Sequence, residues 1–314
     1  MDDVNPQSRA GGVALLQSMQ QRANEIIVGK QHQLKLATAC LIAGGHLLID
    51  DVPGMGKTTL AHTLARLFGL EFSRVQFTSD LLPADILGVS VFEGADTGFV
   101  FHPGPVFSQL VLADEVNRAS PKTQSALLEA MEEGQVTIDG VTRTLPAPFF
   151  VIATQNPGEQ VGTFPLPESQ LDRFMMRLEL GYPSAAAELD LLAGRSRRSM
   201  LEELSPVGQA EQLVAVQRQV ELINTSEALL RYVLDLIRAT RASTELRDGL
   251  SPRAGLALKR AAQAWAYMDA RDYVLPEDVQ AVFAAVVAHR LRTADRRPLS
   301  AEAVLGIVEH VAIP

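Results

Sequence analysis

A glycine-rich segment that carries a lysine and two threonines is the part of the sequence best suited to chemistry. It reads Asp51, Val52, Pro53, Gly54, Met55, Gly56, Lys57, Thr58 and Thr59, between an apolar run and a helical pattern. The backbone N–H groups of such a loop and the N-terminus of the helix after it bind nucleotide phosphates. We expect Lys57 to reach the β- and γ-phosphates and the Thr58 hydroxyl to bind Mg²⁺. A chance glycine-rich turn is the alternative, which the predicted strand and helix on either side disfavour.

Two further features bear on a bound nucleotide. Asp51 stands where the general phosphate-loop pattern has glycine, but Asp tolerates unusual backbone angles better than most residues. Upstream of the loop, Val28 and Gly29 are candidates to line a pocket for adenine. A loop that merely enters the first helix of the fold explains them equally well.

Two adjacent carboxylates, Asp114 and Glu115, end an apolar run that begins at Leu110. Buried charge is costly, so a buried strand that delivers two acids to the edge of a crevice needs a reason. We expect Asp114 to hold Mg²⁺ through its water shell, and Glu115 to orient and polarise the attacking water. Solvated loop acids would be an equally good interpretation of the pair alone, but not behind a phosphate loop.

Gln155 and Asn156 end the next apolar run along the chain. A neutral amide at this place can hold the attacking water and sense the γ-phosphate. Because Pro157 follows, Asn156 also has good turn chemistry, and a turn residue is the alternative. Its place at a strand end favours the functional interpretation.

Two arginines are candidates for contact with phosphate. Arg173 precedes the last apolar run, where it could act as a finger on a neighbouring subunit's nucleotide. An ordinary salt bridge with Asp172 or Glu168 is the alternative. Arg253 lies in the first turn of a helix that opens at Ser251, where the helix dipole disfavours a cation. A nearby phosphate would make a cation favourable at this place. The alternative is a solvated arginine whose unfavourable interaction with the helix dipole is small.

The elements that must position these residues follow from five short apolar runs without polar alternation. The runs cover residues 47–49, 75–77, 110–113, 149–153 and 175–180. Such runs are typical of parallel strands covered on both faces, and helical patterns lie between several of them. The order predicts a parallel α/β sheet whose ligand lies at the carboxyl ends of the strands. Residues 134–148, with Asp139-Gly140 at the turn, and residues 89–105 are predicted to be hairpins.

After about residue 184, helical periodicity replaces the strand-like runs. Helices are predicted over residues 205–220, 226–241, 252–268, 276–290 and 300–311. Two of them have proline at the first helical position, a proper start signal. We therefore expect two domains: residues 1–183, an α/β core with an N-terminal helical segment, and residues 184–314, which are all-helical.

Composition narrows the class of protein. The chain has 314 residues with 28 Lys+Arg and 37 Asp+Glu, which gives a formal charge of −9. This acidic balance disfavours a protein that binds the phosphate backbone of nucleic acid. Cys40 is the single cysteine, so no internal disulfide can form. The N-terminus lacks the features of a signal peptide, and the longest apolar stretch, residues 34–49, is too punctuated to span a bilayer. We expect a cytoplasmic protein without a transmembrane segment.

Together these residues resemble the MoxR-type AAA+ ATPases over about residues 26–291. The resemblance rests on long stretches as well as on the phosphate loop. They are residues 74–83 (RVQFTSDLLP), 103–107 (PGPVF), 112–122 (LADEVNRASPK), 250–254 (LSPRA) and 271–274 (RDYV). The acid at Asp51 is a familiar form in this family.

The resemblance implies a parallel five-stranded nucleotide-binding core with a C-terminal helical lid, which uses ATP and Mg²⁺. By position, Lys57 and Thr58 belong to Walker A, and Asp114 and Glu115 to Walker B. In the same way, Asn156 is sensor 1, Arg253 is sensor 2 and Arg173 is the trans finger, with Arg118 as the next candidate. The two hairpins match the helix-2 and pre-sensor-1 insertions.

Members of the family assemble into rings, commonly hexamers, and are similar to chaperones for partner proteins, often beside proteins with von Willebrand factor A domains. Two other functions remain as alternatives: a nucleic-acid motor and a slow nucleotide-gated scaffold. The predicted tip at Asp139-Gly140 has one basic residue nearby, Arg143, and no aromatic residue, so it is a poor platform for single strands.

Overall fold

Five parallel strands form the central sheet of the computed structural model, which describes residues 6–95, 97–157, 162–194 and 196–313. The strand order is β2-β5-β8-β1-β9. The strands are β1 (Leu47–Asp50), β2 (Phe72–Gln76), β5 (Leu110–Asp114), β8 (Phe150–Gln155) and β9 (Met176–Leu178). The predicted parallel α/β core is confirmed, and the last strand is shorter than the apolar run that predicts it.

The central strands are apolar because helices cover both faces of the sheet. Along β5, Leu110 and Leu112 join one buried cluster, whereas Val111 and Ala113 join the other, as alternate side chains of a strand must. The first cluster includes side chains of α1 (Pro6–Ile26), α2 (Gln31–Ile42) and α3 (Lys57–Leu67). The second includes those of α5 (Pro121–Glu133).

Cys40 lies in the first cluster, on α2. Its side chain is fully buried, and its thiol donates a hydrogen bond to the carbonyl oxygen of His46. Burial raises the pKa of the Cys40 thiol far above its ordinary value. This cysteine is therefore a packing residue of the core.

The register of the sheet brings the polar strand ends together. Gln76 of β2 pairs with Asp114 of β5, and Asp50 of β1 pairs with Gln155 of β8. Because all of these strands are parallel, the residues that follow them lie along one edge. The phosphate loop, the two acids and the amide thus meet at the carboxyl edge of the sheet.

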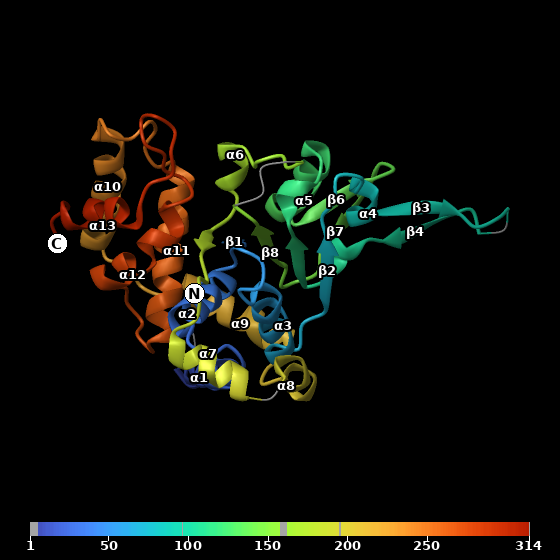
Figure 1. Cartoon of the computed structure of the whole chain (residues 1–314), viewed down its shortest axis with the longest axis horizontal. Coiled ribbons are helices and arrows are strands. Elements are labelled where there is room, and N and C mark those ends of the chain that lie inside the picture. Colours follow the sequence, from blue (N-terminus) through green and yellow to red (C-terminus); the bar gives the residue numbers. More distant parts are fainter. Residues whose placement is uncertain (1–5, 96, 158–161, 195, 314) are drawn as a thin grey trace.

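Both predicted hairpins are present. One consists of β3 (Gly88–Phe92) and β4 (Phe99–Pro103), the other of β6 (Gln135–Ile138) and β7 (Val141–Thr144). The β3–β4 hairpin projects from the side of the molecule opposite to the C-terminal helices (Figure 1). Its Phe92 and Phe99 side chains pack on one another at 5.4 Å between ring centroids, although they are 59% and 75% exposed. An apolar surface is therefore presented to solvent.

The rest of the described chain is helical. Beyond α4 (Pro83–Leu87) and α6 (Glu168–Leu171), it forms α7 (Ala185–Ala193), α8 (Arg197–Glu203), α9 (Ala210–Glu221), α10 (Glu227–Ala242), α11 (Pro252–Met268), α12 (Pro276–Val287) and α13 (Ala301–Glu309). The helix predicted from residue 205 starts later, because the N–H groups of Val207 and Gly208 bond to the carbonyl of Leu67 instead. None of the described helices has the length and apolar surface that crossing a bilayer requires.

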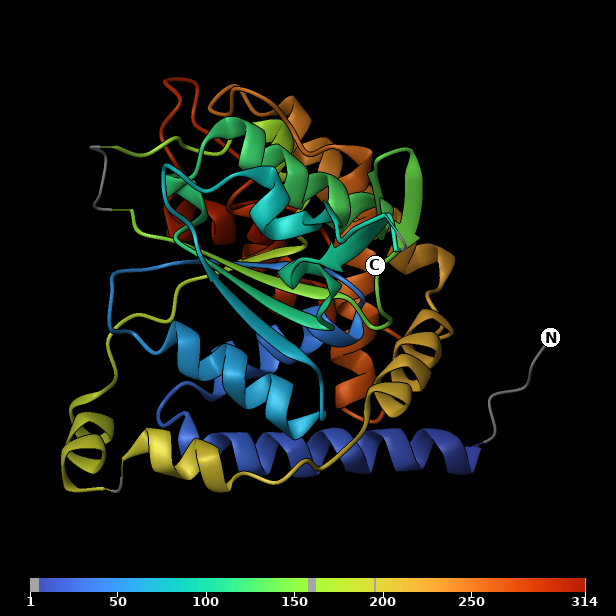
Figure 2. The same ribbon diagram turned by 90° about the vertical axis from the view of Figure 1, so that its right-hand side faces the viewer.

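The helices after residue 184 do not all lie apart from the sheet. Helix α8 contacts α1 and α3, and α9 contacts α1 and α2, so the chain first returns to the α/β part (Figure 2). Helices α10 to α13 then form the group at one end of the molecule (Figure 1). The domain boundary at residues 183 and 184 stays a prediction, and residues 1–5 and 314 at the ends of the predicted domains lie outside the described residues.

Candidate active site

The phosphate loop has the backbone that its glycines predict. Gly54 and Gly56 have φ of +87° and +91°, in the left-handed region that favours glycine. Gly56 caps α3, and no described side chain accepts a hydrogen bond from its first turn. The N–H groups of that turn and the positive end of the helix therefore face the crevice, which is the arrangement that binds phosphate.

A cavity of about 370 Å³ opens above this loop at the carboxyl edge of the sheet. Its walls combine the loop with the acids of β5 and two polar residues of β2. They are Pro53, Gly54, Gly56, Lys57, Thr58, Thr59, Arg74, Gln76, Asp114 and Glu115. Most of the predicted phosphate and metal residues thus share one cavity, whereas Val52, Met55 and Asn156 lie outside its lining.

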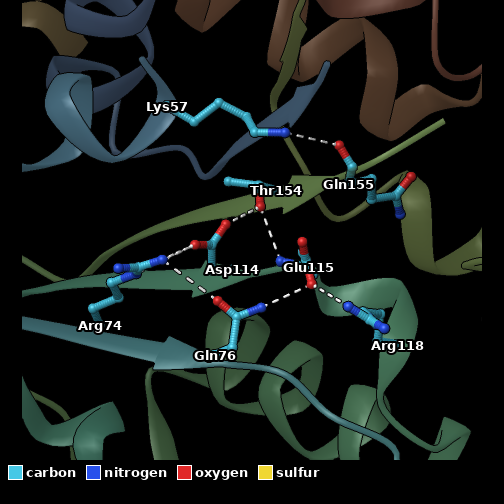
Figure 3. Close-up of polar contacts among 8 residues, drawn as sticks. All are labelled: Lys57, Arg74, Gln76, Asp114, Glu115, Arg118, Thr154 and Gln155. Atoms are coloured by element: carbon cyan, nitrogen blue, oxygen red, sulfur yellow. Dashed lines mark hydrogen bonds and ion pairs between the residues drawn. The ribbon is translucent and has the colours of Figure 1, made fainter. Parts of the chain in front are cut away.

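The ammonium of Lys57 lies over the ends of two strands. Its Nζ donates to the carbonyl oxygen of Asp51 at 2.5 Å, and the side chain is buried. It also donates to the carbonyl oxygen of Gln155 at 3.3 Å (Figure 3). The hydrogen-bond partners of Lys57 in the described part of the chain are neutral carbonyls, so this desolvated cation is well placed to attract a phosphate.

Four side chains hold the two acids at the end of β5 (Figure 3). Arg74 Nη2 donates to Asp114 Oδ2 at 2.6 Å, and Thr154 Oγ1 donates to Asp114 Oδ1 at 2.6 Å. Gln76 Nε2 and Arg118 Nη1 donate to Glu115 Oε2 at 2.8 and 2.9 Å. Both carboxylates are therefore fixed by neighbours.

The backbone of Glu115 is in the left-handed region, with φ of 57°, which is unfavourable for a residue with a side chain. Its N–H donates to Thr154 Oγ1 at 2.9 Å, a bond that holds this conformation. Thr154 is completely buried and so connects Asp114 with Glu115 through one hydroxyl. Strain of this kind is concentrated at functional sites, which agrees with a catalytic role for Glu115.

Thr154, Arg74 and Gln76 had no role in the sequence-based predictions. Their signals were weak: Thr154 is the polar residue that directly follows the apolar run at residues 149–153, and Arg74 and Gln76 alternate along β2. Residues two apart on a strand share one face, and here that face meets the acids of β5. The neighbouring strand, however, is known only once the sheet order is known.

The donors present fit a magnesium ion. Thr58 and Asp114 line the same cavity and offer a hydroxyl and a carboxylate, the oxygen donors that Mg²⁺ prefers. Asp114 accepts hydrogen bonds from Arg74 and Thr154, but a carboxylate has about four lone-pair sites, so further acceptor capacity remains.

A second, largely apolar cavity of about 210 Å³ adjoins the phosphate loop. It is lined by Ile26, Ile27, Val28, Lys30, Gly54, Met55, Gly56, Thr59, Leu180, Pro183 and Arg197. Val28 is thus part of this wall, whereas Gly29, with φ of +73°, is not among the residues that line it. The role of the cavity as an adenine pocket stays a prediction. A Cβ on Gly29 would lie 2.9 Å from that of Ala187, so glycine allows α7 to approach closely.

Arg173 and Arg253 lie together and line neither cavity. Arg173 Nη2 is 3.0 Å from Oε2 of Glu132, and Arg253 donates to the other oxygen of the same carboxylate. The hydrogen bond from Arg253 lowers the pKa of Glu132. The alternative salt-bridge partners of Arg173 are therefore wrong, and Glu132 of α5 compensates the cation at the start of α11.

The segment around Arg173 is also held by Arg290, which follows α12. Arg290 Nε donates to Asp172 Oδ1 at 2.6 Å, and its Nη2 donates to the carbonyl of Phe174 at 2.7 Å. Asn156 is buried where β8 ends. Its role as a sensor stays a prediction, as do the roles of both arginines.

Comparison with known proteins agrees with this architecture. Residues 46–176 match the ATPase family associated with various cellular activities (AAA), and residues 238–306 match the AAA lid domain. The chain is 45% identical over 304 residues to the uncharacterized protein YeaC of Bacillus subtilis (strain 168), which covers 96% of this chain and 95% of YeaC. It is 38% identical over 310 residues to Chaperone MoxR1 of Mycobacterium tuberculosis, over 92% and 80% of the two chains. A crystal structure of a provisionally assigned ATPase from Cytophaga hutchinsonii, at 36% identity, superposes with a TM-score of 0.90 over 98% and 97% of the chains.

The fold and the site define an AAA ATPase with a helical lid. The chain belongs to the MoxR-type AAA+ ATPases, as its sequence stretches predict. It is therefore an ATP-hydrolysing enzyme.

Proposed function

We propose that this ATPase binds ATP with Mg²⁺ at the phosphate loop and works in a hexameric ring of identical subunits to remodel or mature partner protein complexes. One observation carries the proposal. Lys57, Thr58, Asp114 and Glu115 face a single cavity, while the predicted finger Arg173 lies outside it. Such a site has the groups for hydrolysis but receives its last cation from another subunit.

The chemistry is assigned to the residues as follows. Lys57 exchanges its two carbonyl partners for the β- and γ-phosphates. Thr58 and Asp114 would hold Mg²⁺, whose charge offsets that of the phosphates when it is bound. Glu115, fixed by its neighbours, orients the attacking water and polarises it, and Asn156 senses the γ-phosphate.

Arg173 is assigned to the nucleotide of the neighbouring subunit, and Arg253 accompanies it. Glu132 holds the two guanidinium groups together, away from the nucleotide cavities of their own chain. Arg118 instead contacts Glu115 of its own chain. This contact supports a role for Arg118 within its own site and favours Arg173 as the finger in trans.

A mixing experiment tests the assignment. Arg173→Ala keeps Glu115 but loses the donated cation, and Glu115→Gln keeps Arg173 but inactivates its own site. In a randomly mixed head-to-tail ring, about a quarter of the interfaces combine a working Glu115 with a working Arg173. We expect partial ATPase activity to return when the two inactive proteins are mixed. Full activity of Arg173→Ala on its own would refute the assignment.

A protein partner is supported by three observations. A relative is named a chaperone, and the β3–β4 hairpin exposes Phe92 and Phe99. The guanidinium of Arg143, on the other hairpin, donates to the carbonyls of Ile138 and Val141 and lies 3.9 Å over the Phe101 ring, which disfavours single-strand binding.

Affinity capture tests the choice of partner. Glu115→Gln protein should retain its partners with ATP and release them with ADP. We expect client proteins, including a protein with a von Willebrand factor A domain. Retention of nucleic acid alone would favour the motor instead.

A further inference from the structure

Asp51, the first residue of the phosphate loop, also contacts a segment outside that loop. Asp51 is buried, and its Oδ2 accepts a hydrogen bond from the N–H of Gly181 at 2.6 Å. Its Oδ1 accepts from the N–H of Val52 at 2.8 Å, and its carbonyl accepts from Lys57. A glycine at position 51 would keep the carbonyl contact and lose both contacts of the carboxylate.

Gly181 belongs to a connector, residues 180–183, that leads from the sheet to α7. A second buried charge also holds it, since Lys30 Nζ donates to the carbonyl of Tyr182 at 2.6 Å. The residues at the two ends of the connector, Leu180 and Pro183, line the second cavity. The connector is therefore one wall of that cavity, held by an anion at its first peptide group, through the N–H of Gly181, and by a cation at its last, through the carbonyl of Tyr182.

We propose that Asp51 and Lys30 position the connector as a wall of the purine-base pocket, so that Asp51 acts on binding of the base although it stands in the phosphate loop. Asp51 is thus a positioning residue, and its contact with the connector explains why an aspartate stands where the general phosphate-loop pattern has glycine. This inference rests on the proposed function, ATP binding at the phosphate loop, together with the prediction that the second cavity, which Val28 lines, takes the base of the nucleotide.

The competing explanation is that Asp51 only shapes the phosphate loop through its bond to Val52. The two explanations differ in which part of the nucleotide they affect. Loss of the connector weakens binding of the base and spares the phosphates. Loss of loop geometry weakens every ligand that carries the same phosphates, with or without a base.

Titration calorimetry with ATP and with inorganic tripolyphosphate separates them. Asp51→Gly restores the general loop pattern and removes the hydrogen bond to Gly181. A net hydrogen bond to a charged group is worth roughly a tenfold change in affinity, so we expect about tenfold weaker ATP binding and unchanged tripolyphosphate binding. Equal weakening of both ligands, or no change in either, would overturn the inference.

Lys30→Met provides a second variant, so the test does not depend on how Asp51→Gly folds. Because Lys30 also lines the cavity, the double variant with Asp51→Gly separates loss of the connector from loss of a direct contact with the base. Lys30→Met should show the same difference between the ligands: about tenfold weaker binding of ATP and unchanged binding of tripolyphosphate. Lys35→Met is the matched control, because Lys35 lies on α2, which begins directly after the N-cap residue Lys30, but pairs with Asp269 at 2.6 Å and lines neither cavity. It should bind both ligands as the wild type does.

Combining Asp51→Gly with Lys30→Met tests whether they hold one element. If both act through the connector, the double variant should lose about tenfold for ATP, not the hundredfold expected of independent contacts. A hundredfold loss would contradict a shared wall. If the wild-type chain binds ATP no more tightly than tripolyphosphate, the base pocket itself is misassigned and the proposed site fails. If the wild type shows the preference and the variants keep it, only the role of Asp51 and Lys30 fails.

Discussion

Replacing Thr154 by valine should disconnect the two acids of the active site with little change of shape. The Thr154 hydroxyl is fully buried, donates to Asp114 at 2.6 Å and accepts the N–H of Glu115 at 2.9 Å. Valine can do neither. The strained backbone of Glu115 then loses the bond that holds it, and the Asp114 carboxylate keeps its contact with Arg74.

The magnitude follows from these two bonds. A buried N–H left without a partner costs about 1–3 kcal/mol, and a hydrogen bond to a charged group contributes about 1.5–3 kcal/mol. Because Arg74 still neutralises Asp114, we expect a loss of about 3 kcal/mol in the free energy of unfolding. Displacement of the Glu115 carboxylate by on the order of 1 Å should lower kcat about 100-fold.

Urea unfolding and steady-state ATPase assays measure the two effects. Thr38→Val is the matched control, since that hydroxyl is also fully buried but donates to the carbonyl of Leu34 within α2 at 2.8 Å. It should cost about 1 kcal/mol and leave kcat unchanged. Thr154→Ser should restore most of the activity. Wild-type kcat in Thr154→Val, or a stability loss no larger than that of Thr38→Val, would refute the reasoning.

The remaining predictions concern the phosphate-loop lysine, the catalytic carboxylate Glu115 and one buried histidine. Lys57→Ala should abolish ATP binding in calorimetry, since a desolvated charged contact is worth roughly 2–5 kcal/mol; unchanged affinity would contradict the phosphate-loop assignment. Glu115→Gln should bind ATP but hydrolyse it on the order of 100-fold more slowly, and near-normal turnover would move the catalytic base elsewhere. Burial lowers the pKa of His46 to about 4, and its Nδ1 accepts the N–H of Val151. The unfolded chain therefore binds more protons below pH 6.5, so stability falls as the pH drops, by about 2 kcal/mol at pH 5. In urea titrations at pH 7 and pH 5, His46→Gln should lose this part of the pH dependence, and an unchanged slope would rule it out.

Local chemistry made much of the fold and site predictable. The glycines that adopt positive φ, the acids that end β5 and the Asp139-Gly140 turn each express a short-range rule, and each predicted element formed. Apolar runs predicted the strands, but helix starts were less certain, because the N–H groups of Val207 and Gly208 bond to the carbonyl of Leu67 and α9 starts only after them. Such a contact cannot be read from periodicity.

The partners of the site residues were not predictable in the same way. Thr154 contacts Asp114 only because β8 lies beside β5 in this register. Glu132 contacts Arg173 and Arg253 only because the end of α5, the segment before β9 and the start of α11 meet in space. These contacts join positions that are far apart in the chain, and no spacing rule covers them.

Burial of Cys40 has a practical consequence for spectroscopy. The chain has one thiol, which is shielded from solvent, hydrogen-bonded and kept protonated, so thiol-directed dyes find no reactive thiolate in the folded state. A cysteine introduced at an exposed position, such as Glu93 beside the projecting hairpin, would then be the single labelling site. Fluorescent or spin labels can thus report movements of that hairpin during the ATP cycle in an otherwise native chain.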